Sequence, residues 1–306
     1  MKKKYISSLI LLTSFVAISY SQSVSFLNTL SDARIAAMGN SGYVLSSPFA
    51  VQYNSASVMP EYDPKIGVGA SLLLWQPQAA DATLVNVAGY TKMKKFGLMA
   101  GFRSNKFGNI EKTDDHGNII GSFAPSENAL EIGMGYNASS AISLGISMRY
   151  LSSRIDQNTK SSSIASDISL LYHHQQLRLG VGLSNLGPKI DYGYAKYQLP
   201  SRIKTGIAYH FLLNEAHAFI TAADLFYQLT PNYSGIASGF GAEYNYKKML
   251  ALRTGYHYES KYVGASYATI GLGTYFSGLS LDFAYMIASD NNPMRQTMLF
   301  TLKWEK

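Results

Sequence analysis

The sequence predicts an all-β protein: a 14-stranded antiparallel transmembrane β-barrel with a short N-terminal plug segment. Two observations carry this prediction. From about Asp63 onward, apolar residues alternate with small or polar ones in many short segments, and the connections between these segments alternate in length. Successive side chains of a strand point to opposite faces, so each segment has one apolar face and one polar face.

Composition narrows the class of protein. Only 15% of the 306 residues are charged, whereas 47% are hydrophobic and 13% aromatic; a soluble domain averages about 25% charged residues. This deficit argues against an ordinary cytoplasmic enzyme. The body of the chain has no apolar run of the ~18 residues that a transmembrane helix needs. With no Cys, disulfides, thiolate metal sites and a Cys nucleophile are excluded.

The first residues have the features of an export signal. Met1 to Lys4 are cationic, Ile6 to Ile18 are apolar, and Ser19-Tyr20-Ser21 supplies small residues before Gln22. This order is typical of a cleaved signal peptide, which we place at residues 1–21. Without these residues, which include three Lys and no acid, the formal charge falls from +7 to +4. This charge is too mild and too scattered to indicate a nucleic-acid partner.

The alternating segments are predicted to be strands long enough to cross a bilayer, which takes about 9–11 residues when tilted. In residues 279–287, for example, Leu279, Leu281 and Phe283 alternate with Ser280 and Asp282. The predicted strands are 64–75, 81–92, 95–107, 127–138, 141–155, 163–174, 176–187, 200–211, 216–228, 236–247, 249–259, 267–276, 278–288 and 296–304.

The connections indicate where the barrel sits. Links after odd-numbered strands are long, and links after even-numbered strands are only a few residues. Outer-membrane barrels show this asymmetry, with long loops outside and short turns in the periplasm. A soluble β-sandwich also alternates apolar and polar residues but has no reason to sort its loops in this way. We therefore expect residues 63–306 to form a barrel in the cell outer membrane. The long links are 76–80, 108–126, 156–162, 188–199, 229–235, 260–266 and 289–295.

Residues 22–62 alternate poorly and are predicted to form the plug. A short helix is expected from Ser31 to Met38, with Ser31 as its N-cap, Asp32 in its first turn, and Gly39 and Gly42 ending it. Inside an even-stranded barrel such a segment would fill the lumen.

Several short motifs resemble those of one protein family. Asp32-Ala33-Arg34, followed by the 38–42 run Met-Gly-Asn-Ser-Gly, resembles the opening motif of the PorV/PorQ outer-membrane proteins of the type IX secretion system. Asn54 matches that family's next motif, whereas Tyr53 and Ser55 depart from it. The runs at 113–118, 183–189, 199–206, 241–244, 251–256 and 281–285 resemble later family motifs in the same order. The plug motif residues are Asp32, Arg34, Met38, Gly39, Gly42 and Asn54.

The resemblance implies a barrel similar to that of the long-chain fatty acid transporter FadL and a role in type IX secretion. The implied partners are secreted cargo or surface attachment proteins bound by the extracellular loops, besides outer-membrane lipid. The chief loops are 108–126 and 188–199. Tyr is favoured at protein interfaces, and loop 188–199 is rich in it. The candidate loop residues are Asp114, Asp115, Tyr192, Tyr194 and Tyr197. A FadL-like transporter of hydrophobic small molecules is the alternative, because fold does not determine function.

The sequence offers few signs of a catalytic or metal-binding site. The six His form no HExxH motif or other ligand spacing, and no G-x-S-x-G elbow is present. We therefore expect no metal, no cofactor and no enzymatic activity. Charges on the polar strand faces are better candidates, because opposite signs would form a salt-bridged interior that anchors the plug through Asp32 or Arg34; a merely polar lumen is the alternative. These lumen charges are Glu131, Arg149, Arg178, Arg253 and Asp282, with Glu259 and Lys303 on the same faces.

Overall fold

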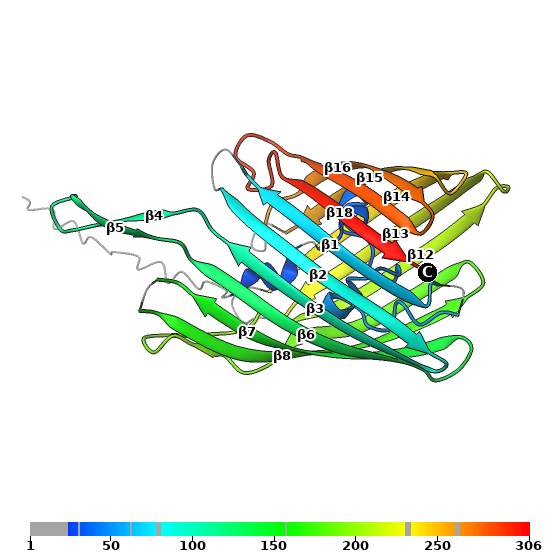
Figure 1. The fold of residues 1–306 in the computed structure, drawn as a ribbon, viewed down its shortest axis with the longest axis horizontal. Coiled ribbons are helices and arrows are strands. Elements are labelled where there is room, and N and C mark those ends of the chain that lie inside the picture. The colour runs from blue at the N-terminus through cyan, green and yellow to red at the C-terminus, as the bar shows by residue number, and fades with distance from the viewer. Residues whose placement is uncertain are drawn as a thin grey trace, which may run out of the picture.

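Fourteen strands close into one antiparallel barrel, which confirms the predicted fold class (Figure 1). The computed structural model describes residues 24–29, 31–61, 63–77, 81–156, 158–229, 234–260 and 264–306; the predicted signal peptide lies outside them. Each barrel strand pairs with the barrel strands that precede and follow it in the chain, and β1 closes the barrel against β18.

The observed strands agree with the predicted segments to within a few residues. The barrel strands are β1 (Ile66–Trp75), β2 (Ala82–Met93), β3 (Phe96–Lys106), β6 (Ser126–Asn137), β7 (Ile142–Arg154), β8 (Lys160–His174), β9 (Leu177–Leu186), β12 (Arg202–Leu212), β13 (His217–Gln228), β14 (Gly235–Tyr246), β15 (Leu250–Glu259), β16 (Tyr267–Phe276), β17 (Leu279–Ile287) and β18 (Met298–Glu305).

The alternation sorts the two faces of the wall as predicted. Along β7, Ile146 and Met148 are exposed on the outside, whereas Ser147 and Arg149 are buried on the inside. The same pattern recurs around the barrel, so large apolar side chains cover its outer wall. A lipid-facing apolar band of this kind is the mark of a transmembrane barrel.

Two of the long connections carry strands that the sequence did not predict. Residues 108–126 hold β4 (Ile110–Thr113) and β5 (Ile119–Phe123), and residues 188–199 hold β10 (Ile190–Asp191) and β11 (Lys196–Tyr197). The β4–β5 hairpin extends well beyond the barrel rim, at the end opposite the C-terminus (Figure 1). Its tip is a turn in which the Asp114 carboxylate accepts backbone hydrogen bonds from His116 and Asn118.

The N-terminal segment from 24 to 61 runs through the inside of the barrel (Figure 1). It contains η1 (Ser25–Asn28), α1 (Ala33–Ala37) and η2 (Ala50–Gln52). The prediction for its helix was wrong in detail: α1 begins at Ala33, and its N-cap is Asp32, whose side chain accepts from the Arg34 N–H at 2.9 Å. None of the helices in the described ranges is long and apolar enough to cross a membrane.

The segment approaches the wall most closely where the wall has no side chains. A Cβ on Gly255 would lie 2.2 Å from the backbone of Met38 and Gly39, and one on Gly241 would lie 2.3 Å from the Met38 carbonyl oxygen. Real Cβ atoms do not approach other atoms so closely. Glycine on the inner face of β14 and β15 therefore makes room for the turn that follows α1.

A Gly255→Val substitution is expected to destabilise the folded barrel by about 1–3 kcal/mol, because added volume in a filled interior forces the backbone apart. The outward substitution Leu252→Val on the same strand is the control. Heat-induced unfolding followed by circular dichroism and gel mobility measures both. Equal transition temperatures for the two variants would contradict this close fit.

Candidate functional site

Helix α1 directs two opposite charges at the barrel wall. The Arg34 guanidinium makes a two-point contact with Glu243 of β14, with Nε–Oε2 and Nη2–Oε1 distances of 2.8 Å. Asp32 is the N-cap of α1, and its carboxylate lies 3.4 Å from the Lys303 ammonium of β18. Bidentate Arg–carboxylate pairs combine strength with a defined geometry, so these contacts set the orientation of α1.

The wall connects these two contacts through further ion pairs. Arg253 Nε lies 2.5 Å from Glu243, and Arg253 Nη1 lies 2.7 Å from Asp282. Asp282 lies 2.9 Å from Lys303. Five ion pairs therefore link six charges in a row, and the backbone N–H of Arg34, which donates to Asp32, joins the two ends. We call this arrangement the six-charge ring: Asp32, Arg34, Glu243, Arg253, Asp282 and Lys303.

The strand register explains how these charges meet. Glu243 and Arg253 are direct partners in the β14–β15 pairing, whereas Arg253 and Asp282 lie on strands separated by β16. At Gly273 of β16, an added Cβ would lie 2.5 Å from Asp282 and 2.7 Å from Arg253. Glycine there leaves the space in which the two side chains reach each other across β16.

A second network of buried charges lies on β3, β6, β7 and β8. Glu131 accepts from Arg103 at 2.6 Å and lies 3.0 Å from Arg149, which in turn pairs with Asp167 at 2.7 Å. Arg103 also donates to the backbone oxygen of Leu27 at 3.2 Å, so this network too contacts the N-terminal segment.

A third contact joins Arg178 to the start of the barrel. Its guanidinium lies 2.8 Å from Asp63 and donates to the Val44 backbone oxygen at 3.2 Å. The five predicted lumen charges are thus all buried and all ion-paired, but they fall into three separate groups. Glu131 and Arg149 share one group, Arg253 and Asp282 another, and Arg178 belongs to the third.

Sequence reasoning missed several residues of these networks. Glu243, Arg103 and Asp167 were not among the predicted lumen charges, although each is buried inside the barrel. The signal for Glu243 was present, because it lies two positions from Gly241 and therefore on the same face of β14. Its pairing with Arg34 joins residues 209 positions apart, which no local pattern indicates.

The remaining residues of the predicted plug motif also contact the wall or order the segment. The N–H groups of Gly42 and Tyr43 both donate to Asp224, at 2.7 and 2.8 Å. Gly39 has a φ of +67° and donates to Thr269. The Asn54 amide donates to the Tyr43 carbonyl oxygen at 2.8 Å. Met38 is fully buried. These contacts support the assignment of residues 22–62 as a plug, which stays a prediction.

The predicted loop residues lie at the rim that carries the long loops. Asp114 sits at the tip of the β4–β5 hairpin, where hydrogen bonds from the Asn118 amide and neighbouring backbone N–H groups hold its pKa below the ordinary value. Neighbouring Asp115 is exposed. Tyr194 is 68% exposed, whereas Tyr192 is buried and donates to Ser153 at 2.8 Å. Tyr192 therefore supports the loop rather than presenting its own surface.

The described residues give little support for a metal site. They contain no group of three or more His, Asp or Glu side chains placed to hold a metal ion. His257 and Glu259 form a pair, with Nε2 and Oε1 3.1 Å apart. The expectation of no cofactor stays a prediction.

Comparison with known proteins settles the family. A family model described as "Type IX secretion system protein PorV" matches residues 17–233. The chain belongs to the PorV family. Together with the closed barrel, this membership indicates an outer-membrane protein. A search of curated proteins finds no match.

Solved structures show where else the PorV-family barrel fold occurs. The Ralstonia pickettii toluene transporter TbuX is 13% identical, with a TM-score of 0.64 over 89% of this chain and 97% of its own. The P. putida toluene transporter TodX is 11% identical, with the same TM-score and coverage. A Pseudomonas aeruginosa FadL homologue is 10% identical, with a TM-score of 0.50 over 90% of this chain and 98% of its own. At such identities the likeness shows the fold alone.

Removing one charge from the six-charge ring is expected to destabilise the protein strongly. Glu243→Gln keeps the shape of the side chain but leaves Arg34 and Arg253 without a carboxylate. Breaking a buried pair in this way costs about 3–5 kcal/mol. The free energy of unfolding in urea, measured in detergent micelles, and the protease resistance of the N-terminal segment are both expected to fall.

Lys196→Ala is the matched control, because Lys196 and Asp191 form an exposed pair on the β10–β11 loop. Exposed pairs contribute about 0–1 kcal/mol. If Glu243→Gln changed stability no more than Lys196→Ala does, the ring would not anchor the segment.

Proposed function

We propose that this protein is a non-enzymatic outer-membrane component of the type IX secretion system that binds secreted cargo or a surface partner protein through the long loops of its outer rim. Membership in the PorV family supports the assignment to the type IX secretion system. The β4–β5 hairpin is the observation that supports the binding role. The hairpin stands clear of the wall (Figure 1), where lipid does not explain an apolar surface.

The hairpin presents three isoleucines to its surroundings. Ile119 and Ile120 are 63% and 57% exposed, and Ile110 of the facing strand is 46% exposed. Exposed apolar side chains gathered on one small element are a feature of protein-binding surfaces. Asp114 and Asp115 lie at its tip, and Tyr194 and Tyr197 belong to the β10–β11 loop of the same rim. Together these residues are the proposed partner surface.

Transport of hydrophobic small molecules is the second candidate. Solved structures with this fold are described as toluene transporters, and a cavity of about 440 Å³ lies at the long-loop end of the barrel. A filled interior favours the partner-binding role, because the N-terminal segment is tied to the wall by buried charge networks on several strands.

Replacing the hairpin isoleucines tests the proposed role. Ile119→Glu combined with Ile120→Glu is expected to reduce partner capture from native outer membranes at least tenfold, because residues central to an interface contribute about 2 kcal/mol or more each. Captured proteins are quantified by mass spectrometry, and export of type IX cargo is followed in the same strains.

The control is Glu111→Gln with Lys112→Gln, which keeps the three isoleucines of the same hairpin. Full capture by the isoleucine variant, or purification with bound lipid and no protein partner, would contradict the proposal and favour the transporter.

A further inference from the structure

Exposed Lys side chains outnumber exposed acidic side chains at the end of the barrel that carries the short turns and the C-terminus (Figure 1). At the long-loop end, exposed ion pairs join Lys196 to Asp191 at 2.9 Å and Arg295 to Asp290 at 3.1 Å. Among the described residues, no ion pair includes an exposed Lys of the short-turn end. These exposed residues are Lys65, Lys94, Lys95, Lys247, Lys248 and Lys306, with Glu61 and Glu215 as the exposed acids.

The β14–β15 turn holds two of these lysines in an unfavourable backbone conformation. Lys247 and Lys248 have φ values of 50° and 53°. This left-handed region is adopted easily by glycine and is unfavourable for residues with a longer side chain. The β16–β17 turn at the same end has Gly278 in this region, at a φ of 83°. Strained residues of this kind gather at functional sites. The shape of the turn does not explain the Lys pair, which points to a role for its side chains.

The β2–β3 turn repeats the arrangement. It consists of Lys94, with a φ of 50°, and Lys95. In both turns an exposed apolar or aromatic residue precedes the Lys pair and another follows it: Met93 and Phe96 in one turn, and Tyr246 and Met249 in the other. The Lys247 ammonium lies 5.3 Å from the centre of the Tyr246 ring. Since interfacial aromatic rings sit at the level of the lipid headgroups, both Lys pairs lie where the apolar outer wall ends.

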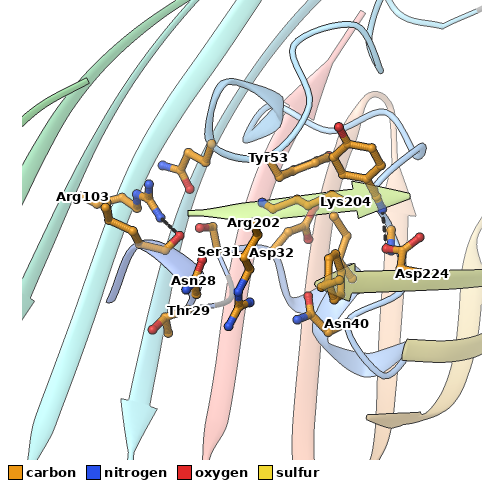
Figure 2. Close-up of a pocket in the computed structure, with 16 residues that line it drawn as sticks. Asn28, Thr29, Ser31, Asp32, Asn40, Tyr53, Arg103, Arg202, Lys204 and Asp224 are labelled. Carbon is orange, nitrogen blue, oxygen red and sulfur yellow. Dashed lines mark hydrogen bonds between the residues drawn. The ribbon is translucent and has the colours of Figure 1, made fainter. Parts of the chain in front are cut away.

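A lysine inside the barrel is in a different situation. Lys204 lines a cavity of about 60 Å³ together with Asp32 and Asp224 (Figure 2). The ammonium groups of the two turns, by contrast, make no hydrogen bond to any described residue. Glu215, on the adjacent β12–β13 turn, forms no ion pair with them within the described part of the chain. Their charge is thus available to a group outside the protein.

We infer that the Lys pairs of the β2–β3 and β14–β15 turns bind the phosphate of anionic phospholipids in the membrane leaflet at the short-turn end. The ammonium groups meet the phosphate as point charges, and the flanking apolar side chains contact the acyl chains. Basic residues beside a membrane surface are attracted to anionic lipid, whereas a zwitterionic lipid carries its own cation beside the phosphate. Strands β1, β18, β17 and β16 separate the two turns, so each turn binds its own lipid. This inference stands apart from the protein-binding role of the hairpin, which shares no residue with these turns.

Native mass spectrometry in detergent micelles tests the inference, because it counts the lipid molecules that stay bound. Protein purified from outer membranes is delipidated and offered an equal mixture of phosphatidylglycerol and phosphatidylcholine with identical acyl chains. Bound phosphatidylglycerol is expected to exceed bound phosphatidylcholine at least fivefold, since a Lys near an anionic surface strengthens binding by roughly that factor. An excess of soluble glycerol phosphate is expected to leave the lipid bound.

Lys247→Asn with Lys248→Gly, combined with Lys94→Asn and Lys95→Gln, is expected to bring the ratio of the two bound lipids close to one. Heat stability is expected to stay unchanged or to rise, because Asn and Gly suit left-handed turn positions. Arginine at the same four positions keeps the charge and is expected to keep the preference.

The control is Lys160→Asn with Lys189→Asn, which removes exposed charge from the long-loop end and leaves the preference unchanged. Equal binding of the two lipids to the unmodified protein overturns the inference without reliance on any variant. Displacement of the lipid by glycerol phosphate, or an undiminished preference after removal of the four turn lysines, also overturns it. The hairpin variant still tests the partner role separately.

Discussion

A charged side chain buried inside a membrane-spanning barrel needs a partner of opposite charge close by, because burying an unpaired charge is unfavourable. In this barrel that constraint is met largely by pairing. The six-charge ring contains three cations and three anions, and the network around Glu131 contains two of each. In the ring, the N-terminal segment supplies one charge of each sign. The segment's two charges cancel each other, as do the wall's four, so the contacts do not balance net charge. They give each charge of the segment a buried wall partner of opposite sign, on which its burial depends.

This mutual dependence explains why so short a helix is ordered. A helix of five residues, such as α1, has too few internal hydrogen bonds to be stable in isolation. Its order comes from contacts with the wall: Arg34 with Glu243, Asp32 with Lys303, and the Ala33 N–H with Thr301. The glycines of β14 and β15 admit the turn that follows. Small residues and charges at inward positions thus specify one placement of the segment among many that a merely polar lumen would allow.

The strands of the wall were predictable from the sequence, because the pattern that marks each strand lies within the strand itself. Each strand repeats with period two, so fourteen segments could be recognised without knowing their neighbours. The partners of the charges were not predictable, because Arg34 and Glu243 meet only when the barrel closes and brings β14 within reach of the Arg34 side chain. The β4–β5 hairpin was also missed. Its two short strands lie within residues 108–126, which the sequence predicted only as a long connection.

The same comparison separates residues that hold the fold from those available for binding. Glu131, Arg149, Arg253 and Asp282 each form ion pairs inside the wall, so a ligand that competed for one of them would leave its partner buried and unneutralised. By contrast, Ile119, Ile120 and Tyr194 lie exposed at the rim that carries the long loops. A partner that covered these side chains would break no buried ion pair of the wall. Contact at the rim therefore leaves the charge networks of the lumen intact, whereas contact inside the lumen would not.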